Sequence, residues 1–192
     1  KLKKNYSICT GCSSGCNVTI EHDRNEVFRL KPHENQNVNK WWLCDEGRLT
    51  YRMMNERKTR ITRPLGRVEG NLEGVSWEEA YGAIVKRVKE LKPFPHEVLA
   101  LTDTRASNEE LFLLQKLLKE GFSSDNIFCP LPKWGQIESD FFINTLITTD
   151  KTPNRAGALA LKINGDEKNA KLKKVIEGEL KVVFILGNPF EA

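Results

Sequence analysis

The chain opens with short stretches in which apolar and polar residues alternate. Two of them cover residues 17–22 (NVTIEH) and 26–30 (EVFRL). A period of two is typical of a half-buried β-strand, which turns one face to the core and the other to solvent. We therefore expect small antiparallel strands in the first region of the chain.

From Ser76 onward the hydrophobic period becomes helical. Ser76 and Glu79 form a capping box, which is a typical helix start. Apolar residues then recur at helical spacing and predict an amphipathic helix that ends before a proline: Trp77, Ala80, Tyr81, Ile84, Val85, Val88 and Leu91, followed by Pro93. A second capping box, Ser107 with Glu110, begins a predicted helix that ends at Gly121.

Apolar runs between and after these helices predict strands. They cover residues 97–103 (EVLALTD), 126–130 (NIFCP) and 180–186 (LKVVFIL). We expect the last strand to be fully buried between neighbours on both sides, with a further helix at residues 166–179 before it. Strands that alternate with helices favour a mostly parallel sheet covered on both faces.

The predicted fold class is therefore α/β, divided into two domains. Residues 1–65 would form a small domain with short antiparallel strands, and residues 66–192 the beginning of an α/β domain, truncated at the C-terminus after its last strand. Residues 60–76, with one proline and three glycines, are the candidate linker. The loop at residues 130–159 is long for a compact domain, which favours a functional or interfacial role.

Composition narrows the classes of function. With 39% hydrophobic and 29% charged residues, the chain is ordinary for a globular protein. No apolar run approaches about 18 residues, so we expect no direct membrane insertion. The net charge is +4, and basic residues gather at residues 52–63. This cluster lacks a stacking platform or a groove-reading helix, so no nucleic-acid partner is expected; a solvated face or a surface that docks on an acidic partner is the preferred interpretation.

Four of the five cysteines form a pattern that indicates metal binding. Their spacing is Cys-x2-Cys-x3-Cys-x27-Cys, made by Cys9, Cys12, Cys16 and Cys44. A [4Fe–4S] cluster needs one thiolate at each of four corners, and a tight loop can supply three while a distant segment supplies the fourth. Gly11 and Gly15 give that loop the backbone freedom it needs. The pattern predicts these four cysteines as the ligands of a [4Fe–4S] cluster.

Two other uses of the cysteines stay open. Structural zinc usually takes its ligands as two separated pairs, which a three-plus-one layout matches poorly, but a zinc-stapled interaction module remains an alternative. A disulfide framework is less suitable for a chain of this length with so few cysteines. The fifth thiol, Cys129, lies in an apolar run and is interpreted as a buried small residue.

Other candidate residues give weaker signals. The pair Trp41 and Trp42 precedes Cys44, and we interpret it as packing that shields a cluster from water. The three histidines, His22, His33 and His96, have no ligand spacing and are expected at the surface. No Ser/His/Asp set, carboxylate pair or dinucleotide-binding glycine motif stands out, so no catalytic residue is assigned.

Several motifs accompany the cysteines in order along the chain. Gly47-Arg48 follows the fourth cysteine, Arg-x-x-Arg-Pro occupies residues 60–64, and SWEEA and SNEE begin at residues 76 and 107. Together they resemble the iron–sulfur entry domain of the molybdopterin oxidoreductase superfamily, over nearly the whole chain. The resemblance implies that Arg48 and nearby amides offset the negative charge of the cluster.

Two branches of this superfamily compete. Molybdenum and tungsten enzymes, such as formate dehydrogenases and nitrate reductases, commonly place Lys or Arg two residues after the fourth cysteine, where it is thought to bridge the cluster to the pterin. This chain has Glu46 there, and its charge would lie between two anionic groups. The stretches VNKWWLCDEGRLTY and LITTDKTPNRAGAL are also similar to stretches of the large iron–sulfur subunit of NADH:quinone oxidoreductase (respiratory complex I).

The resemblance therefore favours a segment of this large iron–sulfur subunit over the alternative, the N-terminal part of a molybdenum or tungsten bis-pterin oxidoreductase such as formate dehydrogenase. It implies that the chain is part of an enzyme as a subunit of NADH:quinone oxidoreductase (NADH dehydrogenase). The cluster would then have an electron-transfer or structural role. The expected partners are the other subunits of a multi-subunit respiratory complex. The expected location is cytoplasmic, in the peripheral arm of a complex on the inner membrane.

Overall fold

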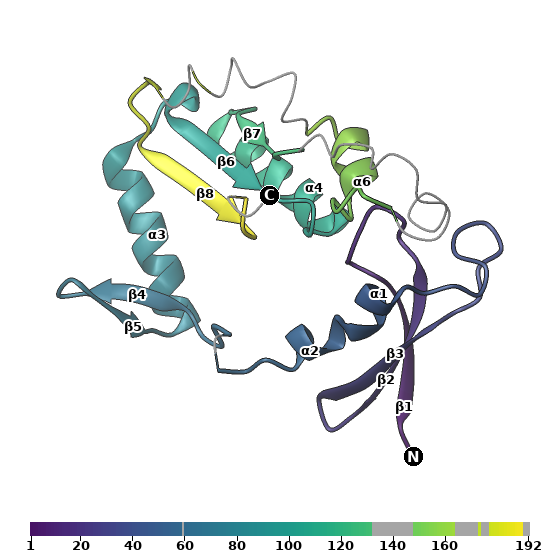
Figure 1. The fold of residues 1–192 in the computed structure, drawn as a ribbon. Coiled ribbons are helices and arrows are strands. Elements are labelled where there is room, and N and C mark those ends of the chain that lie inside the picture. The colour runs from purple at the N-terminus through teal and green to yellow at the C-terminus, as the bar shows by residue number, and fades with distance from the viewer. Residues whose placement is uncertain (59, 132–147, 164–172, 174–176, 190–192) are drawn as a thin grey trace.

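The computed structural model describes residues 1–58, 60–131, 148–163, 173 and 177–189. Figure 1 shows an antiparallel sheet formed by the first strands of the chain, at a distance from a parallel sheet that includes the strand β8 (Val182–Leu186). Between them the chain passes through two short helices, a hairpin and a long helix. This arrangement confirms the predicted fold class, short antiparallel strands followed by an α/β region with a parallel sheet.

The first sheet is antiparallel, in the order β1-β2-β3. Its strands are β1 (Lys3–Ile8), β2 (Asn17–Asp23) and β3 (Glu26–Pro32), and the last two confirm the strands predicted from alternation. Strand β1 escaped prediction because all its residues are exposed and leave no apolar face to detect. One cluster of buried hydrophobic residues forms a small core beside this sheet: Cys9, Val18, Leu30 and Leu43.

Two short helices follow: α1 (Asp45–Leu49) and α2 (Tyr51–Met54). The side chain of Asn55 fastens the end of α2 to the sheet. Its amide nitrogen donates to the Val27 carbonyl at 2.7 Å, and its oxygen accepts from the Val27 N–H at 2.9 Å. Asn55 thereby acts as a strand partner for β3 and keeps the helical segment after Cys44 close to the first sheet.

The candidate linker contains structure that its sequence did not predict. Strands β4 (Leu65–Val68) and β5 (Asn71–Gly74) pair as an antiparallel hairpin. Glu69 and Gly70 form its turn with φ angles of 48° and 89°, as a two-residue hairpin turn requires. The candidate linker therefore contains a hairpin. The proposed domain boundary between residues 65 and 66 stays a prediction.

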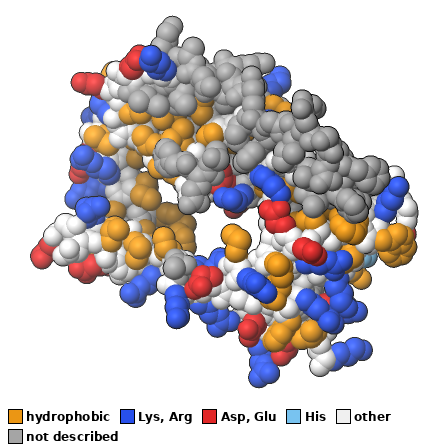
Figure 2. Space-filling model, in the orientation of Figure 1, with side chains coloured by type: hydrophobic (Ala, Val, Ile, Leu, Met, Phe, Trp, Pro, Cys, Tyr) orange, Lys and Arg blue, Asp and Glu red, His pale blue; other side chains and the backbone are white. Residues whose placement is uncertain are grey.

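Helix α3 (Trp77–Leu91) begins at the predicted capping box and ends just before Pro93, where Lys92 takes a left-handed conformation with a φ of 41°. The helix is amphipathic as predicted, but none of its side chains is buried. Trp77 and Tyr81 are 64% and 59% exposed. We call the part with the antiparallel sheet β1-β2-β3 the first half of the molecule and the part with the parallel sheet that includes β8 the second half. Figure 2 shows open space between these two halves, with hydrophobic side chains along its border.

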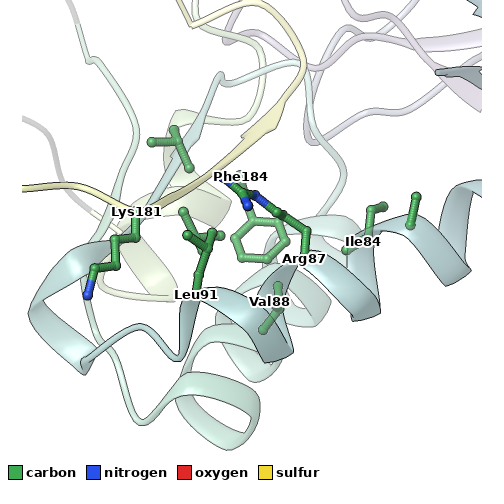
Figure 3. A pocket seen from close by; sticks show the side chains of 9 residues that line it. Ile84, Arg87, Val88, Leu91, Lys181 and Phe184 are labelled. Atoms are coloured by element: carbon green, nitrogen blue, oxygen red, sulfur yellow. The ribbon is translucent and has the colours of Figure 1, made fainter. Parts of the chain in front are cut away.

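Only the second part of α3 approaches the parallel sheet. There it forms a groove of about 460 Å³ with the strand β8 (Val182–Leu186). Figure 3 shows Phe184 of the strand pointing toward Val88 and Leu91 of the helix. The helix therefore meets the sheet along its last two turns, and its first two turns lie away from it.

The second sheet is parallel, with the order β7-β6-β8. Its other strands are β6 (Val98–Thr102), which follows the short helix η1 (Pro95–Glu97), and β7 (Ile127–Phe128). Helix α4 (Asn108–Lys116) starts at the second predicted capping box and continues as a π-helical turn, η2, to Gly121, the predicted end. The buried core gathers residues of these elements and of α6 (Arg155–Ala160): Ala100, Ala106, Leu111, Leu114, Leu118, Ile127, Cys129, Leu131, Ala158 and Ile163.

Strand β8 differs from its prediction as a fully buried strand. Val183 and Ile185 are 44% and 56% exposed and alternate with half-buried residues, so one face of β8 is exposed. In the described part of the chain β8 also pairs with β6 alone. Most of the predicted helix at residues 166–179 and residues 132–147 of the predicted loop lie outside the described residues. Helix α6 occupies part of the described remainder of that loop. No helix among the described residues is both long enough and apolar enough to span a bilayer.

Candidate functional site

The fold brings the distant fourth cysteine to the loop that holds the other three. The loop leaves β1 at Cys9 and returns to β2 after Cys16, and the Cys9 N–H donates to the Cys16 carbonyl at 2.8 Å. Cys44 caps the N-terminus of α1, where its sulfur accepts from the Gly47 N–H at 3.3 Å. A Cβ atom added to Gly47 would lie 3.2 Å from the Cys9 sulfur and 3.5 Å from the Cys44 sulfur. Both sulfur atoms therefore lie close to this glycine, and a larger residue here would also have to displace Leu43, whose Cδ1 is 2.9 Å from the added Cβ.

The four thiols share one electrostatic environment. Burial raises the pKa of the Cys9 thiol, and the nearby Cys12 and Cys44 raise it further, while an N–H from Gly11 opposes them. Burial, with contributions from the three other cysteines, raises the pKa of Cys16 to about 11. Metal ligation requires thiolates, so binding here must release protons, and only a strongly charged metal group compensates for four sulfur anions in so small a volume.

The described residues contain no compact site for a single ion. Tetrahedral zinc, with Zn–S bonds of about 2.3 Å, brings its sulfur atoms to within about 4 Å of one another. Among the described residues, no three His, Cys, Asp or Glu side chains lie close enough to hold one metal ion. All five cysteines are also free of disulfides. A cubane has its ligands at four separate corners, and Cys9, Cys12, Cys16 and Cys44 stay its predicted ligands.

Arg48 acts on the backbone of the fourth ligand segment. Its Nε donates to the Leu43 carbonyl at 3.1 Å, and the side chain is half-buried. This contact fixes the chain direction just before Cys44. The predicted role of Arg48 in offsetting cluster charge stays a prediction.

Asn39 is a second residue that organises this segment, and no sequence signal pointed to it. It is 7% exposed. Its amide nitrogen lies within hydrogen-bonding distance of the carbonyls of Asn17, His33 and Trp42, and its oxygen accepts from the Asn17 N–H. A lone asparagine cannot be assigned such a role from sequence, because its partners are far apart along the chain.

The tryptophan pair does not shield the site as predicted. Trp41 and Trp42 are 67% and 42% exposed. Leu43 is instead the buried residue of this segment, at 1% exposure, and it packs against Cys9 in the first core. The apolar cover of the cysteine loop thus comes from an aliphatic residue next to the tryptophans.

The expectations for Cys129 and the histidines hold. Cys129 is fully buried in the second core, and burial raises its pKa to about 12. His22 forms a hydrogen bond with Asn5 at 2.9 Å, and His33 stacks on Tyr6. His96, the third histidine, is exposed and stacks on Phe94.

A lysine from the second half of the molecule completes the site, and its sequence context predicted no such role. The Nζ of Lys151 lies 2.5 Å from Oε2 of Glu46, 105 residues away in sequence. The adjacent Asp150 accepts a hydrogen bond at its carbonyl from the Ser13 N–H of the cysteine loop, at 2.9 Å. The acid at position 46 is therefore paired.

A cavity of about 620 Å³ opens beside this ion pair. Its charged lining consists of Arg60, Arg105, Lys151 and Glu46, and the cysteine loop contributes Thr10 and Gly11. Three cations against one anion suit a negatively charged ligand. Arg105 also borders a second cavity of about 380 Å³, which lies at the carboxyl ends of β6 and β8, the edge where ligands bind in parallel sheets.

Comparisons with known proteins cover both halves of the chain. Residues 2–56 match the family model described as Molybdopterin oxidoreductase Fe4S4 domain, and residues 60–132 match the one described as Molybdopterin oxidoreductase. The chain is 30% identical to a protein of Staphylococcus haemolyticus named "Putative formate dehydrogenase", over 69% of this chain and 14% of the relative. Two Staphylococcus aureus proteins of the same name, from strains RF122 and MSSA476, are 27% identical over the same shares. The chain thus spans about one seventh of these relatives' length.

Proposed function

Because this chain belongs to the molybdopterin oxidoreductase superfamily, we propose that it is the cluster-bearing segment of a molybdenum or tungsten oxidoreductase of the formate dehydrogenase type. The Fe4S4 domain indicates a [4Fe–4S] cluster. The names of the relatives support the formate dehydrogenase interpretation, which the sequence motifs had placed second to the large iron–sulfur subunit of complex I.

The observation that carries this choice is the ion pair between Glu46 and Lys151. The sequence argument against a pterin rested on an uncompensated acid next to the cluster. With the acid paired, and with Arg60 and Arg105 on the same cavity, the local charge suits the anionic pyrophosphate of a pterin cofactor. The objection based on position 46 therefore loses its force.

The chain's own residues have defined tasks in this function. When bound, the cluster supplies one-electron transfer. The four cysteines hold it, and the N–H groups of Gly11 and Gly47 donate toward their sulfur atoms. Leu43 excludes water from the inner side of the cysteine loop. Arg60 and Arg105 would bind the anionic part of the second cofactor from the cavity.

Metal and cofactor analysis of the parent protein tests the proposal. We expect iron and acid-labile sulfide in a ratio of four to four per chain, together with molybdenum or tungsten and a pterin released on denaturation. Reduction should give the electron paramagnetic resonance (EPR) signal of a [4Fe–4S] cluster. Zinc without iron would contradict the cluster itself.

The large iron–sulfur subunit of NADH:quinone oxidoreductase is the second candidate, favoured by the sequence similarity around Cys44 and residues 146–159. Under it the partners would be other subunits of a respiratory complex, and the location the cytoplasmic peripheral arm. Iron and sulfide without molybdenum, tungsten or pterin in the parent protein would favour this candidate. Neither candidate involves nucleic acid or membrane insertion of this segment.

A further inference from the structure

We propose that Lys151 sets the reduction potential of the cluster held by the four cysteines, and that Glu46 keeps its ammonium group in place. This inference rests on the proposed cluster. It assigns an electrostatic role to a residue that enters the site from the α/β half of the molecule.

The segment that carries Lys151 is fastened at both ends. Toward the cysteine loop, the Asp150 carbonyl accepts the Ser13 N–H at 2.9 Å. Toward the parallel sheet, the Asn154 N–H donates to the Thr104 carbonyl at 2.9 Å, and its side chain donates to the Ala106 carbonyl at 2.9 Å. These contacts hold the backbone of residues 150–154 between the two halves of the molecule.

The turn itself is also rigid. The Asp150 carboxylate accepts hydrogen bonds from the N–H and hydroxyl of Thr152, and from Nε of Arg155 at 2.8 Å. Lys151 projects from this turn, with its side chain only 32% exposed against 58% for Glu46. Its position follows from the fold, whereas a lysine on a free surface would sample many positions.

The charge of Lys151 acts on the sulfur atoms as well as on Glu46. Partial burial alone would lower the pKa of Lys151, but Glu46, Cys12 and Cys44 together raise it above its ordinary value. Glu46 lies in α1 two residues after Cys44, and Asp150, the neighbour of Lys151, contacts Ser13 of the cysteine loop. Both members of the ion pair therefore lie within electrostatic reach of the predicted cluster ligands.

The sign of the effect follows from Coulomb's law. One-electron reduction adds one negative charge to a cluster that is already anionic through its four thiolates. A nearby cation stabilises the reduced form and raises the reduction potential, and a nearby anion lowers it. Lys151 and Glu46 should therefore act in opposite directions, which a purely structural role of the pair would not produce.

The test is an EPR-monitored redox titration of the purified, iron-loaded protein and its variants. We expect Lys151→Gln to shift the potential to a more negative value and Glu46→Gln to a more positive one. The double variant should return close to the original potential, since it removes one charge of each sign. Lys151→Arg, which keeps the charge, should stay near the original value.

Lys181→Gln is the matched control. Lys181 is also 32% exposed and pairs with a glutamate, Glu97, at 2.9 Å, but it lies beside α3 at the start of β8 (Figure 3). It should leave the potential unchanged. An unchanged potential in Lys151→Gln with full iron content would overturn the inference. If that variant takes up no iron, the Glu46→Gln titration decides, and a shift to a more negative value or no shift rejects it. Absence of iron from the unaltered protein would instead reject the proposed cluster.

Discussion

The two halves of the molecule are stabilised in different ways. Among the described residues, the core of the first half has four buried members, one of them the predicted ligand Cys9, whereas the core of the second half has ten, around a parallel sheet. Buried apolar area is the main source of stability in a small domain, and a small core usually needs a metal or a disulfide in addition. The bound cluster should therefore contribute to the stability of the first half, whereas packing of buried side chains should be enough to stabilise the second half.

The largest effect should follow removal of the fourth ligand. Cys44→Ala should abolish iron binding, and the first half should then lose its protection from hydrogen exchange, because a metal site that forms only in the folded state contributes its binding energy to folding. Protection in β6 and α4 should persist. Iron analysis and exchange mass spectrometry measure both effects.

Cys129→Ala is the control for this prediction. It removes a thiol of the same kind from the second core and should leave the iron content unchanged. Equal loss of protection in both halves of Cys44→Ala would mean that the two halves unfold as one unit.

Next in size is an effect confined to the second half. Leu111→Ala should lower the free energy of unfolding by about 2–5 kcal/mol, because it removes a fully buried side chain and leaves a cavity. The iron content should not change. Leu113→Ala, in the same helix at a position 61% exposed, should stay within about 0.5 kcal/mol. Urea denaturation followed by circular dichroism provides the comparison, and equal losses in both variants would contradict it.

A smaller effect is expected at Asn39. Asn39→Ala should destabilise the first half by about 1–3 kcal/mol, because it leaves buried carbonyls of the segment before Cys44 without their donor. Exposed Asn37→Ala serves as control. The rate of iron loss to a chelator is the measurement, and it should rise in Asn39→Ala alone. Unchanged release would show that Leu43 and Arg48 suffice to position the fourth ligand.

The smallest effect is a pH dependence of the first sheet. A hydrogen bond from Arg29, with help from Lys31, holds the pKa of Glu21 below its ordinary value against the opposing effect of burial. The stability from Glu21 is therefore fully present above its unfolded pKa of about 4.3 and is lost as the pH falls through the lower folded value. Glu21→Gln should be less stable than the original protein at pH 7, and the difference should vanish in acid.

Denaturant titrations at several pH values test the Glu21 prediction. The exposed Glu73 of the hairpin provides the control, since Glu73→Gln should have little effect at any pH. A difference between Glu21→Gln and the original protein that persists in acid below the lowered folded pKa of Glu21 would show that size or packing, and not charge, is what Glu21 contributes.

Two helices with the same start signal show where sequence prediction ends. Ser76 and Ser107 each begin a helix with a full capping box. Helix α4 buries Leu111 and Leu114, whereas α3 buries none of its residues. Capping is a local interaction and can be predicted from four residues. Burial depends on what packs against the helix, which the helix sequence does not contain.

The amino-acid sequence by itself determined the features that depend on near neighbours: the two helix starts, the alternating strands, the helix end at Gly121 and the spacing of the four cysteines. Its resemblance to the superfamily also rested on these local motifs. The hairpin β4–β5 was missed because its residues are almost all exposed and carry no apolar pattern.

Only the tertiary structure decided how the site is completed. It placed Leu43 and not the tryptophans against Cys9, gave Asn39 its carbonyl partners, and brought Lys151 to Glu46 across 105 residues. The physical reason is that the charge and burial of a side chain depend on every segment that folds around it. An acid that looked unpaired along the chain is paired in space, and this pairing changes which cofactor its surroundings can accept.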